Sequence, residues 1–433
     1  MNSASHAGLE SAGTGVSTGV TPDVIPDNPG AATLRILTLS TTFPNALEPN
    51  TGAFIRSRVM HIARLADLKV AAPVALLNYA KIFGSGISRG HIPRRQRDHN
   101  LDVLHPRWVY PPLGGVLNPL CLALALIRPL SRLRKEFPFD LIDAHFGYPD
   151  GIAAALLARF FRCPFTVTLR GSEVLHARQR LRRLAMRSAL RRARRVFTVS
   201  ERLRQFALSL GVDPARAVTI PNGVDATVFF ARDRSECRRK HSIGAEERII
   251  LSVGNLIELK GHHRIVDALR TLMARGIEAR LLIAGDAGRA ASIAERLQRQ
   301  IHDLGLDASV QLIGRVSADT LAELMSAADV LCLASSSEGW PNVVHEALSC
   351  GLPVVATDVG AVPEMIPSDQ FGLVVPVGDV PALTEALALA LQKPWQRAAI
   401  AAWGNSRSWD QVAREALDQM QAAARESACK RMV

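Results

Sequence analysis

Residues 330–364 read VLCLASSSEGWPNVVHEALSCGLPVVATDVGAVPE, and this stretch decides the fold. Its ends, residues 330–333 and 353–356, are short apolar runs that predict two buried strands. Between them, Gly339 marks a turn and Pro341 suits the first position of a helix. A strand, a loop, a helix and a second strand make a βαβ unit, so the stretch predicts a parallel sheet covered by helices.

The same alternation runs outward along the chain. Further strands are predicted at 248–253, 281–284 and 310–313, and an earlier series at 34–40, 140–144, 164–169 and 195–199. Strand signals lapse and charge rises between residues 222 and 246, which places a linker there. We therefore predict an α/β fold with two Rossmann-like domains facing an interdomain cleft. The predicted boundaries are a flexible, Ser- and Gly-rich tail at 1–32, an N-terminal domain at 33–222 and a C-terminal domain at 223–402.

Composition supports this organisation. The chain has 433 residues, 48% of them hydrophobic and 21% charged, which excludes a largely disordered protein and suits two cores. Its densest apolar run, Cys121 to Ile127, is far shorter than the roughly 18 residues of a membrane span. No signal peptide is visible at the start, so we expect a cytoplasmic protein.

Short metal and redox motifs are absent from the sequence. No two of the six cysteines form a CxxC pair, which argues against a zinc ribbon or a thioredoxin-like site. There is no D-x-D triplet to hold a metal on a nucleotide diphosphate. We therefore predict chemistry without a metal site and without a bound cofactor.

Positive charge is concentrated in one segment. Of the net charge of +12, nine arginines lie between Arg178 and Arg195, with no acidic residue among them. Apolar residues recur there at roughly helical spacing, at Leu181, Leu184, Met186, Leu190 and Ala193. Such a basic amphipathic helix can contact anionic lipid, and a solvated helix face is the alternative. No aromatic residue interleaves the arginines, so we predict no nucleic-acid partner.

The loop and helix after residue 333 carry the strongest chemical signal. The backbone N–H groups of Asn342 and Val343 stand at the positive end of the predicted helix, a natural site for a diphosphate. Glu338 precedes the helix and Glu346 lies on its second turn, so their carboxylates can accept hydrogen bonds from sugar hydroxyls on either side. An ordinary helix cap with surface acids is the alternative.

These residues resemble a known family. The pattern E-G-x-P-x4-E-A-x3-G-x-P-V-V-A-T, from Glu338 to Thr357, is similar to the E-x7-E region of glycosyltransferase family 4, retaining nucleotide-sugar enzymes of GT-B fold. STTFPN at 40–45 and AHFGYPDG at 144–151 resemble the branch that builds exopolysaccharide, capsular and teichuronic-acid-type polymers. The resemblance implies Glu338 at the donor sugar, Glu346 at the ribose, and Gly339, Trp340 and Pro341 in the donor-binding turn.

The resemblance also implies a diphosphate grip after strand 248–253. The family commonly reads G-R-L-x3-K-G there, and this chain keeps Gly254 and Lys260 but has Asn255 in place of the arginine. A solvent-exposed loop lysine is the alternative for Lys260. We hypothesise that Arg170, after strand 164–169, supplies the missing charge; an ion pair between Arg170 and Glu173 is the alternative.

Further site residues follow from the same resemblance. His145 would contact the donor sugar or position the acceptor, with a structural histidine as the alternative. Gly52 would let backbone approach the diphosphate, and Arg315 follows a strand whose counterpart lies by the nucleobase. The turn at Asn222 and Gly223 is a plain turn or a ligand contact. Residues 403–425 resemble the C-terminal helix that crosses back onto the N-terminal domain.

The sequence therefore predicts a retaining glycosyltransferase with an N-terminal acceptor domain and a C-terminal donor domain. It would move a sugar from a nucleotide diphosphate sugar to a carbohydrate or polyprenyl-linked acceptor, with possible contact to the inner face of the plasma membrane. An NDP-sugar epimerase or a phosphorylase-like enzyme on a related frame is the first alternative. A non-enzymatic sugar-nucleotide binder is the second.

Overall fold

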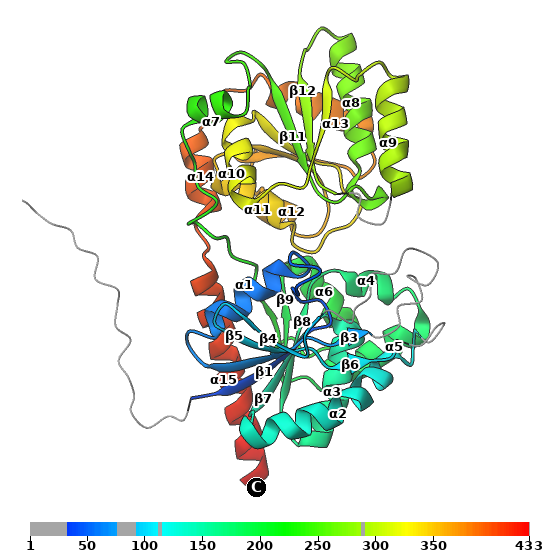
Figure 1. Ribbon diagram of the computed structural model, residues 1–433, viewed down its shortest axis with the longest axis vertical. Coiled ribbons are helices and arrows are strands. Elements are labelled where there is room, and N and C mark those ends of the chain that lie inside the picture. Colours follow the sequence, from blue (N-terminus) through cyan, green and yellow to red (C-terminus); the bar gives the residue numbers. More distant parts are fainter. Residues whose placement is uncertain (1–32, 76–91, 111–114, 287–290, 433) are drawn as a thin grey trace, which may run out of the picture. The chain divides into compact units, whose positions relative to one another are not determined.

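The computed structural model describes residues 33–75, 92–110, 115–286 and 291–432 (Figure 1). The tail predicted at 1–32 lies outside these residues. Two large sheets form the frame, each covered by helices. This α/β arrangement, with mainly parallel strands, is the predicted fold class.

The first sheet has eight strands in the order β10-β9-β8-β7-β1-β2-β5-β4, all parallel to their neighbours except β4. Its strands are β1 (Arg35–Leu39), β2 (Asp67–Ala71), β4 (Arg95–Asp98), β5 (Leu101–Leu104), β7 (Leu141–His145), β8 (Phe165–Leu169), β9 (Arg195–Thr198) and β10 (Ala217–Thr219); β3 (Val74–Ala75) and β6 (Arg107–Trp108) pair separately. Its helical segments are α1 (Ala53–Ile62), α2 (Asn118–Glu136), the π-helical turn η3 (Gly147–Gly151), α3 (Ile152–Phe161), α4 (Ser172–His176), α5 (Arg180–Leu190) and α6 (Glu201–Ser209).

The second sheet has six parallel strands in the order β13-β12-β11-β14-β15-β16. Its strands are β11 (Ile249–Val253), β12 (Arg280–Ala284), β13 (Val310–Gly314), β14 (Val330–Leu333), β15 (Val354–Thr357) and β16 (Gly372–Val375). Its helices are α7 (Arg234–Lys240), the 3-10 turn η4 (Glu258–Lys260), α8 (His262–Ala274), α9 (Ala291–Asp303), α10 (Ala318–Ala327), α11 (Asn342–Ser349), α12 (Val362–Met365), α13 (Val380–Ala390) and α14 (Arg397–Gly404). Buried aliphatic residues form a core on each face of this sheet.

The last helix, α15 (Trp409–Met432), packs against the first sheet, as the long red helix of Figure 1 shows. Val412, Ala416 and Met420 recur every four residues and are fully buried beside residues of β1 and β9. The crossover helix was expected from residue 403, but Trp403 belongs to α14. A break follows Gly404, which packs tightly on the backbone of α11 and ends α14.

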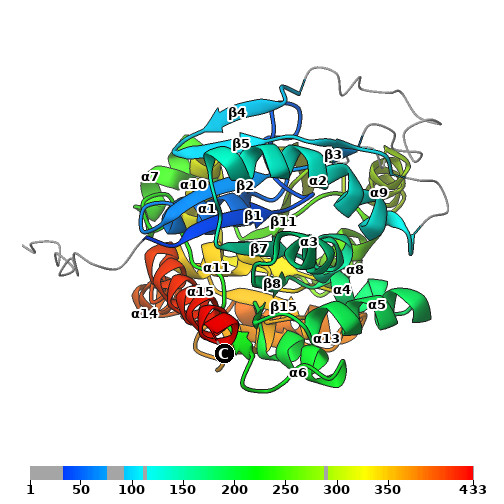
Figure 2. The same ribbon diagram turned by 90° about the horizontal axis from the view of Figure 1, so that it is seen from below.

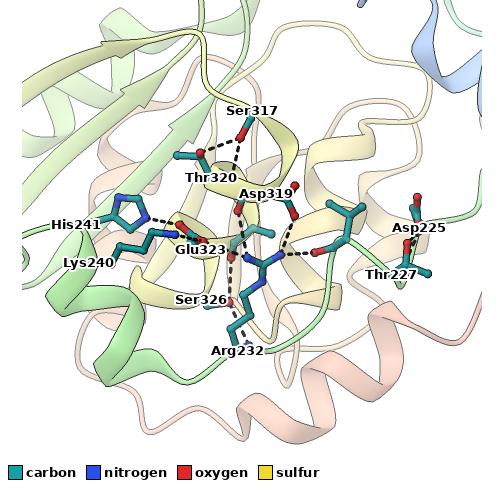
Figure 3. A network of polar contacts seen from close by, with 12 residues as sticks. Asp225, Thr227, Arg232, Lys240, His241, Ser317, Asp319, Thr320, Glu323 and Ser326 are labelled. Carbon is teal, nitrogen blue, oxygen red and sulfur yellow. Dashed lines mark hydrogen bonds and ion pairs between the residues drawn. The ribbon is translucent and has the colours of Figure 1, made fainter.

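The segment between the two sheets is tied to the second one by a polar network (Figure 3). The guanidinium of Arg232 lies 3.2 Å from a carboxylate oxygen of Asp319 and 3.4 Å from one of Glu323. Glu323 also binds Lys240 at 2.6 Å and His241 at 2.9 Å. Opposite charges converge on one carboxylate of α10, so the chain from Arg232 onward packs with the second sheet. The exact predicted boundary at residue 222 stays a prediction.

Several strands of the structure were not predicted from the sequence. β4 reads RQRD and forms the antiparallel edge next to β5, and its charge suits an edge strand but hides it from a hydrophobic pattern. β2, β5, β10 and β16 were also missed, although predicted strands such as β14 and β15 are equally short. Short or polar strands gain their stability from pairing with neighbours, which a local pattern does not contain.

The arginine-rich helix also differs from its prediction. Only residues 180–190 are helical, as α5. Met186 and Leu190 are buried, whereas Leu181 and Leu184 are 62% and 58% exposed. The predicted apolar residues therefore divide between two faces of the helix. Met186 packs in a cluster with Tyr148, and Leu181 and Leu184 lie on the opposite, exposed face. None of the described helices is both long and apolar enough to cross a bilayer.

Candidate functional site

Each large sheet has a point where the strand order reverses. β1 lies between β2 and β7 in the first sheet, and β11 lies between β12 and β14 in the second. Ligands of open parallel sheets bind at the carboxyl ends of the strands at such switch points. Most of the predicted site residues lie at the ends of β1, β7, β11 and β14 or just after them, and Arg170 and Arg315 follow the neighbouring strands β8 and β13.

At the second switch point, Lys260 and Glu338 form an ion pair. The Lys260 Nζ lies 2.6 Å from Glu338 Oε1, and the Ser335 hydroxyl donates to the same oxygen at 2.7 Å. The lysine side chain is 21% exposed and the glutamate 11%. Lys260, predicted to bind the diphosphate, and Glu338, predicted to bind the donor sugar, therefore contact each other directly. A bound nucleotide sugar would replace this ion pair, with Lys260 contacting the diphosphate and Glu338 contacting the sugar.

Helix α11 begins directly after this loop. Pro341 has φ −74° and ψ 92°, so it precedes the first helical residue, Asn342, instead of being that residue as predicted. No side chain caps this end. The first amides, including those of Asn342 and Val343, lack partners within the helix and stand at the positive end of its dipole. The geometry therefore offers an anion site next to Lys260 and Glu338.

Glu346 lies on the second turn of α11 and is partly buried. No described residue donates a hydrogen bond to its carboxylate. Burial raises the pKa of Glu346 to about 7. A carboxyl group without protein partners is available to accept hydrogen bonds from ligand hydroxyls, and such bonds would favour its ionised form.

The remaining predicted donor-side residues lie in neighbouring loops. Gly254 follows β11, and its N–H donates to the Ala284 carbonyl at 2.9 Å. The Asn255 side chain is exposed. Arg315 follows β13 and donates to an Asp286 carboxylate oxygen at 3.2 Å. Trp340 packs edge-on against His345 with ring centroids 5.8 Å apart, which fixes the turn before α11.

His145 ends β7 and is fully buried. Its Nδ1 accepts a hydrogen bond from the Arg170 Nε at 3.2 Å, and its Nε2 lies 3.3 Å from an oxygen of the buried Asp143. Burial lowers the pKa of His145 to about 4, so the ring is neutral at pH 7. His145 was expected in the cleft, where it would contact the donor sugar or position the acceptor, with a structural histidine as the alternative. The ring is fully buried and hydrogen-bonds to Arg170, which fits the structural alternative, and a contact with a ligand stays a prediction.

Arg170 follows β8 and is 7% exposed. Its Nη1 donates to the Asn222 Oδ1 at 3.2 Å. The alternative ion pair with Glu173 is not formed: the Glu173 carboxylate accepts the backbone N–H groups of Gly147 at 2.9 Å and Gly171 at 2.7 Å. No described carboxylate lies within ion-pair distance of this guanidinium. Burial, together with repulsion by the buried Arg58, lowers the pKa of Arg170 to about 9.

Asn222 joins this network to helix α11. Its Nδ2 donates to the Asn342 Oδ1 at 2.9 Å. Nearby, a Cβ on Gly171 would come within 2.8 Å of the Gly339 Cα, so the two loops touch through glycines. From the sequence, Asn222 was expected in a plain turn or in contact with the ligand. Its contacts make it a candidate positioning residue between Arg170 and α11.

At the first switch point, Gly52 precedes α1 with φ 72°. A Cβ there would lie 2.5 Å from the Thr42 carbonyl oxygen, so the loop requires glycine. Asp150, in the loop after β7, accepts hydrogen bonds from the Thr41 N–H at 2.9 Å and hydroxyl at 3.1 Å. The loops after β1 and β7 are therefore pinned together. Within the described residues no three His, Cys, Asp or Glu side chains gather as a metal site; a metal-free reaction stays a prediction.

Two family models match the chain. "Glycosyl transferases group 1" matches residues 233–407, and "Glycosyltransferase Family 4" matches residues 85–228. The matches join near the predicted linker. They cover the second sheet and most of the first.

Named relatives agree with these models. The chain is 27% identical over 371 residues to the teichuronic acid biosynthesis glycosyltransferase TuaC of Bacillus subtilis (strain 168), covering 82% of this chain and 88% of that protein. It is 28% identical over 261 residues to the N-acetyl-alpha-D-glucosaminyl L-malate synthase of Bacillus anthracis, covering 59% of this chain and 66% of that protein.

Solved structures share the fold. The HepE protein of Anabaena, solved in complex with UDP-glucose, superposes with a TM-score of 0.69 at 20% identity, covering 90% of this chain and all of that one. At that identity the likeness establishes the architecture alone. With the two matching family models and relatives that are named glycosyltransferases, it shows that the chain belongs to glycosyltransferase family 4 and has the GT-B fold.

Proposed function

We propose that this enzyme is a retaining glycosyltransferase that moves a sugar from a uridine diphosphate sugar to a carbohydrate or polyprenyl-linked acceptor. The product would be a bacterial surface or exopolysaccharide. Relatives support the two halves of this proposal: TuaC is named for teichuronic acid, and HepE was solved with UDP-glucose.

One observation carries the proposal. The pair of Lys260 and Glu338 lies at the second switch point, and the next helix presents its amino end and Glu346. This set offers a cation and amides for a diphosphate and two carboxylates for hydroxyls. These groups suit the diphosphate and the sugar and ribose hydroxyls of a nucleoside diphosphate sugar.

The chemistry follows from these contacts. Lys260 and the first amides of α11 would stabilise negative charge on the departing diphosphate as the bond from the sugar C1 to the phosphate oxygen breaks. Glu338, released from Lys260, would accept hydrogen bonds from hydroxyl groups of the sugar, and Glu346 would accept them from hydroxyl groups of the ribose. The acceptor oxygen would bond to C1 on the face that the phosphate leaves. Its proton would pass to the departing phosphate oxygen, so no protein nucleophile is required.

The other activities have less support. An epimerase or a phosphorylase-like enzyme would share the frame, but a phosphorylase needs a lysine for pyridoxal, and Lys260 is engaged by Glu338. Membership of a transferase family also disfavours a non-enzymatic binder.

We further propose peripheral contact with the inner leaflet through the segment 178–195. Its nine arginines and the exposed Leu181 and Leu184 support this contact. Sedimentation with phosphatidylglycerol vesicles, but not with phosphatidylcholine vesicles, and release by salt would agree with it. Binding that salt does not weaken would contradict it.

The donor proposal is tested by thermal unfolding with UDP-glucose, UDP-glucuronate, UDP-N-acetylglucosamine and GDP-mannose. A ligand at 100 times its dissociation constant adds about 2.7 kcal/mol to the free energy of unfolding, a clear shift in Tm. Release of UDP with and without glycan acceptors then identifies transfer, and the anomeric configuration of the product, read by NMR, tests retention. If no sugar nucleotide shifts the Tm of the wild-type protein, the proposal fails.

A further inference from the structure

A basic hollow lies away from the two switch-point loops just described. It has a volume of about 590 Å³ and lies between helix α2 and the edge formed by β4 and β5, which Figure 2 shows alongside each other. Its lining comprises Arg94, Arg95, Leu104, His105, Pro106, Arg107, Ala125, Arg128, Pro129, Arg132, Leu133 and Glu136. Five arginines thus face one glutamate.

The arginines of α2 carry most of the uncompensated charge. Arg95 is shared between Asp102, at 3.4 Å, and Glu136, also at 3.4 Å. Arg128 and Arg132 are exposed and make no ion pair with a described carboxylate. Guanidinium groups four residues apart on one helix face can converge on the oxygens of a single phosphate.

His105 adds an independent sign of a ligand. The side chain is 1% exposed, and its Nδ1 donates to the Ala72 carbonyl at 2.9 Å. This bond leaves Nε2 as the free ring nitrogen, and Nε2 is buried without a hydrogen-bond partner among the described residues. A buried polar atom that lines a hollow and lacks a partner calls for a ligand or water.

On the exposed face of α2, apolar side chains precede the two arginines. Leu117, Leu120 and Leu124 are 56%, 45% and 59% exposed. They lie within one face with Arg128 and Arg132, because steps of three and four residues follow the helix period. An apolar stripe that ends at two arginines matches a hydrocarbon chain that ends in phosphate.

The hollow also reaches the edge of the sheet where ligands are expected. His105 follows β5 and Ala72 follows β2, and both strands are parallel to β1 and β7. Their carboxyl ends therefore share one edge of the first sheet with His145 and Thr41.

We propose that this hollow binds the phosphate or diphosphate of a lipid-linked acceptor, with the lipid chain on the stripe of Leu117, Leu120 and Leu124. Arg128 and Arg132 hold the phosphate oxygens, and the His105 Nε2 accepts a hydrogen bond from a water that in turn donates to the phosphate. This inference rests on the proposed function, because it assigns the acceptor of that reaction.

The test uses the full chain with saturating UDP, so that the donor site is filled. Isothermal titration with farnesyl diphosphate and with inorganic pyrophosphate compares the lipid phosphate with free phosphate. We expect one site for farnesyl diphosphate. The double variant R128E/R132E should weaken both ligands at least about tenfold, since it reverses two charges at the phosphate. Lys135→Glu, on the same helix but outside the hollow, is the matched control and should change neither.

The lipid stripe is tested separately with Leu120→Ser and Leu124→Ser together. These exposed positions tolerate polar residues, so the variant should fold and should weaken farnesyl diphosphate but not pyrophosphate. Equal affinities of the wild type and R128E/R132E for both ligands would overturn the inference. The inference would also be overturned if R128E/R132E left both titrations unchanged but abolished sedimentation with phosphatidylglycerol vesicles. That result would show that the exposed face of α2 contacts the membrane and does not bind a phosphate ligand. Titration needs no turnover, so its failure is distinct from failure of the sugar nucleotides to shift the Tm.

Discussion

The two switch points of this enzyme handle charge in opposite ways. In the second sheet, Lys260 and Glu338 neutralise each other while both remain partly exposed. In the first sheet, Arg170 lies buried on a neutral histidine with no described carboxylate in contact. A paired, accessible site can exchange its partners for a ligand. A buried cation without an anion is costly, and its cost falls when an anion arrives.

The contrast suggests different roles for the two sheets in ligand binding. The second sheet would supply contacts that rearrange during each turnover, and the first would supply a fixed positive charge. Asn222 connects the two, since it accepts from Arg170 and donates to Asn342 at the start of α11. Four substitutions test this division, and their expected effects decrease in order.

The largest effect is expected for Lys260→Ala. It removes the mobile cation and leaves Glu338 as an unpaired carboxylate where the diphosphate should bind. Loss of a preorganised charge contact at a reacting centre costs about 100- to 1,000-fold, so kcat/KM should fall by at least that much. Steady-state kinetics with the best UDP sugar measures it. Activity within tenfold of wild type would show that the second switch point does not hold the diphosphate.

Arg170→Ala should have the next largest effect. We expect UDP to bind about 10- to 100-fold more weakly, because the buried charge is lost. Adding Asn255→Arg should restore part of the affinity by returning a guanidinium to the second sheet. Titration calorimetry with UDP measures both variants, and circular dichroism checks that Arg170→Ala folds. Full UDP affinity in a folded Arg170→Ala protein would reduce Arg170 to a structural role.

Glu346→Gln should show opposite effects on stability and on binding. Burial raises the pKa of Glu346 from its usual 4.5 to about 7, so the folded protein holds this proton more tightly than the unfolded chain does. The contribution of the Glu346 carboxyl to the free energy of unfolding is therefore present at low pH and is lost as the pH rises from about 4.5 to 7. The variant should therefore raise the Tm at pH 8 and leave it nearly unchanged at pH 4.

The same variant should bind UDP about tenfold more weakly above pH 7, since an amide oxygen accepts ribose hydroxyls less strongly than a carboxylate. The wild type should gain UDP affinity as the pH rises through 7, and the variant should not. Thermal unfolding and titration across pH 5–8 give both readouts. A pH dependence that persists in the variant would assign it to another group.

The smallest effect is expected for Asn255→Ala. The side chain is exposed and makes no hydrogen bond to a described side chain, so UDP affinity should stay within about twofold. A loss of tenfold or more would mean that the asparagine itself grips the diphosphate. That outcome would also remove the reason for assigning the missing charge to Arg170.

The sequence located most of the candidate site. Glu338, Lys260 and Glu346 stand out because the family pattern fixes their residue types and spacing. Gly52 and Gly339 were expected for the same reason, and the structure adds close backbone contacts that exclude a side chain. The burial of His145 was not predictable, because it depends on Arg170 from another strand and Asp143 two residues earlier.

The arginine-rich segment shows the same division. Its charge and helical spacing were visible, but the depth of Met186 and the exposure of Leu181 and Leu184 depend on which side of α5 meets η3. Likewise, nothing local marks β4 as a strand, since its partner β5 provides the hydrogen bonds.

The sequence by itself therefore determined the order of the central strands and their loops along the chain, the glycines that the turns require, and the kinds of charge at the strand ends. These are local properties, set by backbone geometry and side-chain chemistry within a few residues. Only the tertiary structure decided which charges meet. Lys260 and Glu338 are 78 residues apart in the chain, and Arg170 and Asn222 are 52 apart. Ion pairing and burial depend on distance and on exclusion of water, and both are created when remote segments pack together.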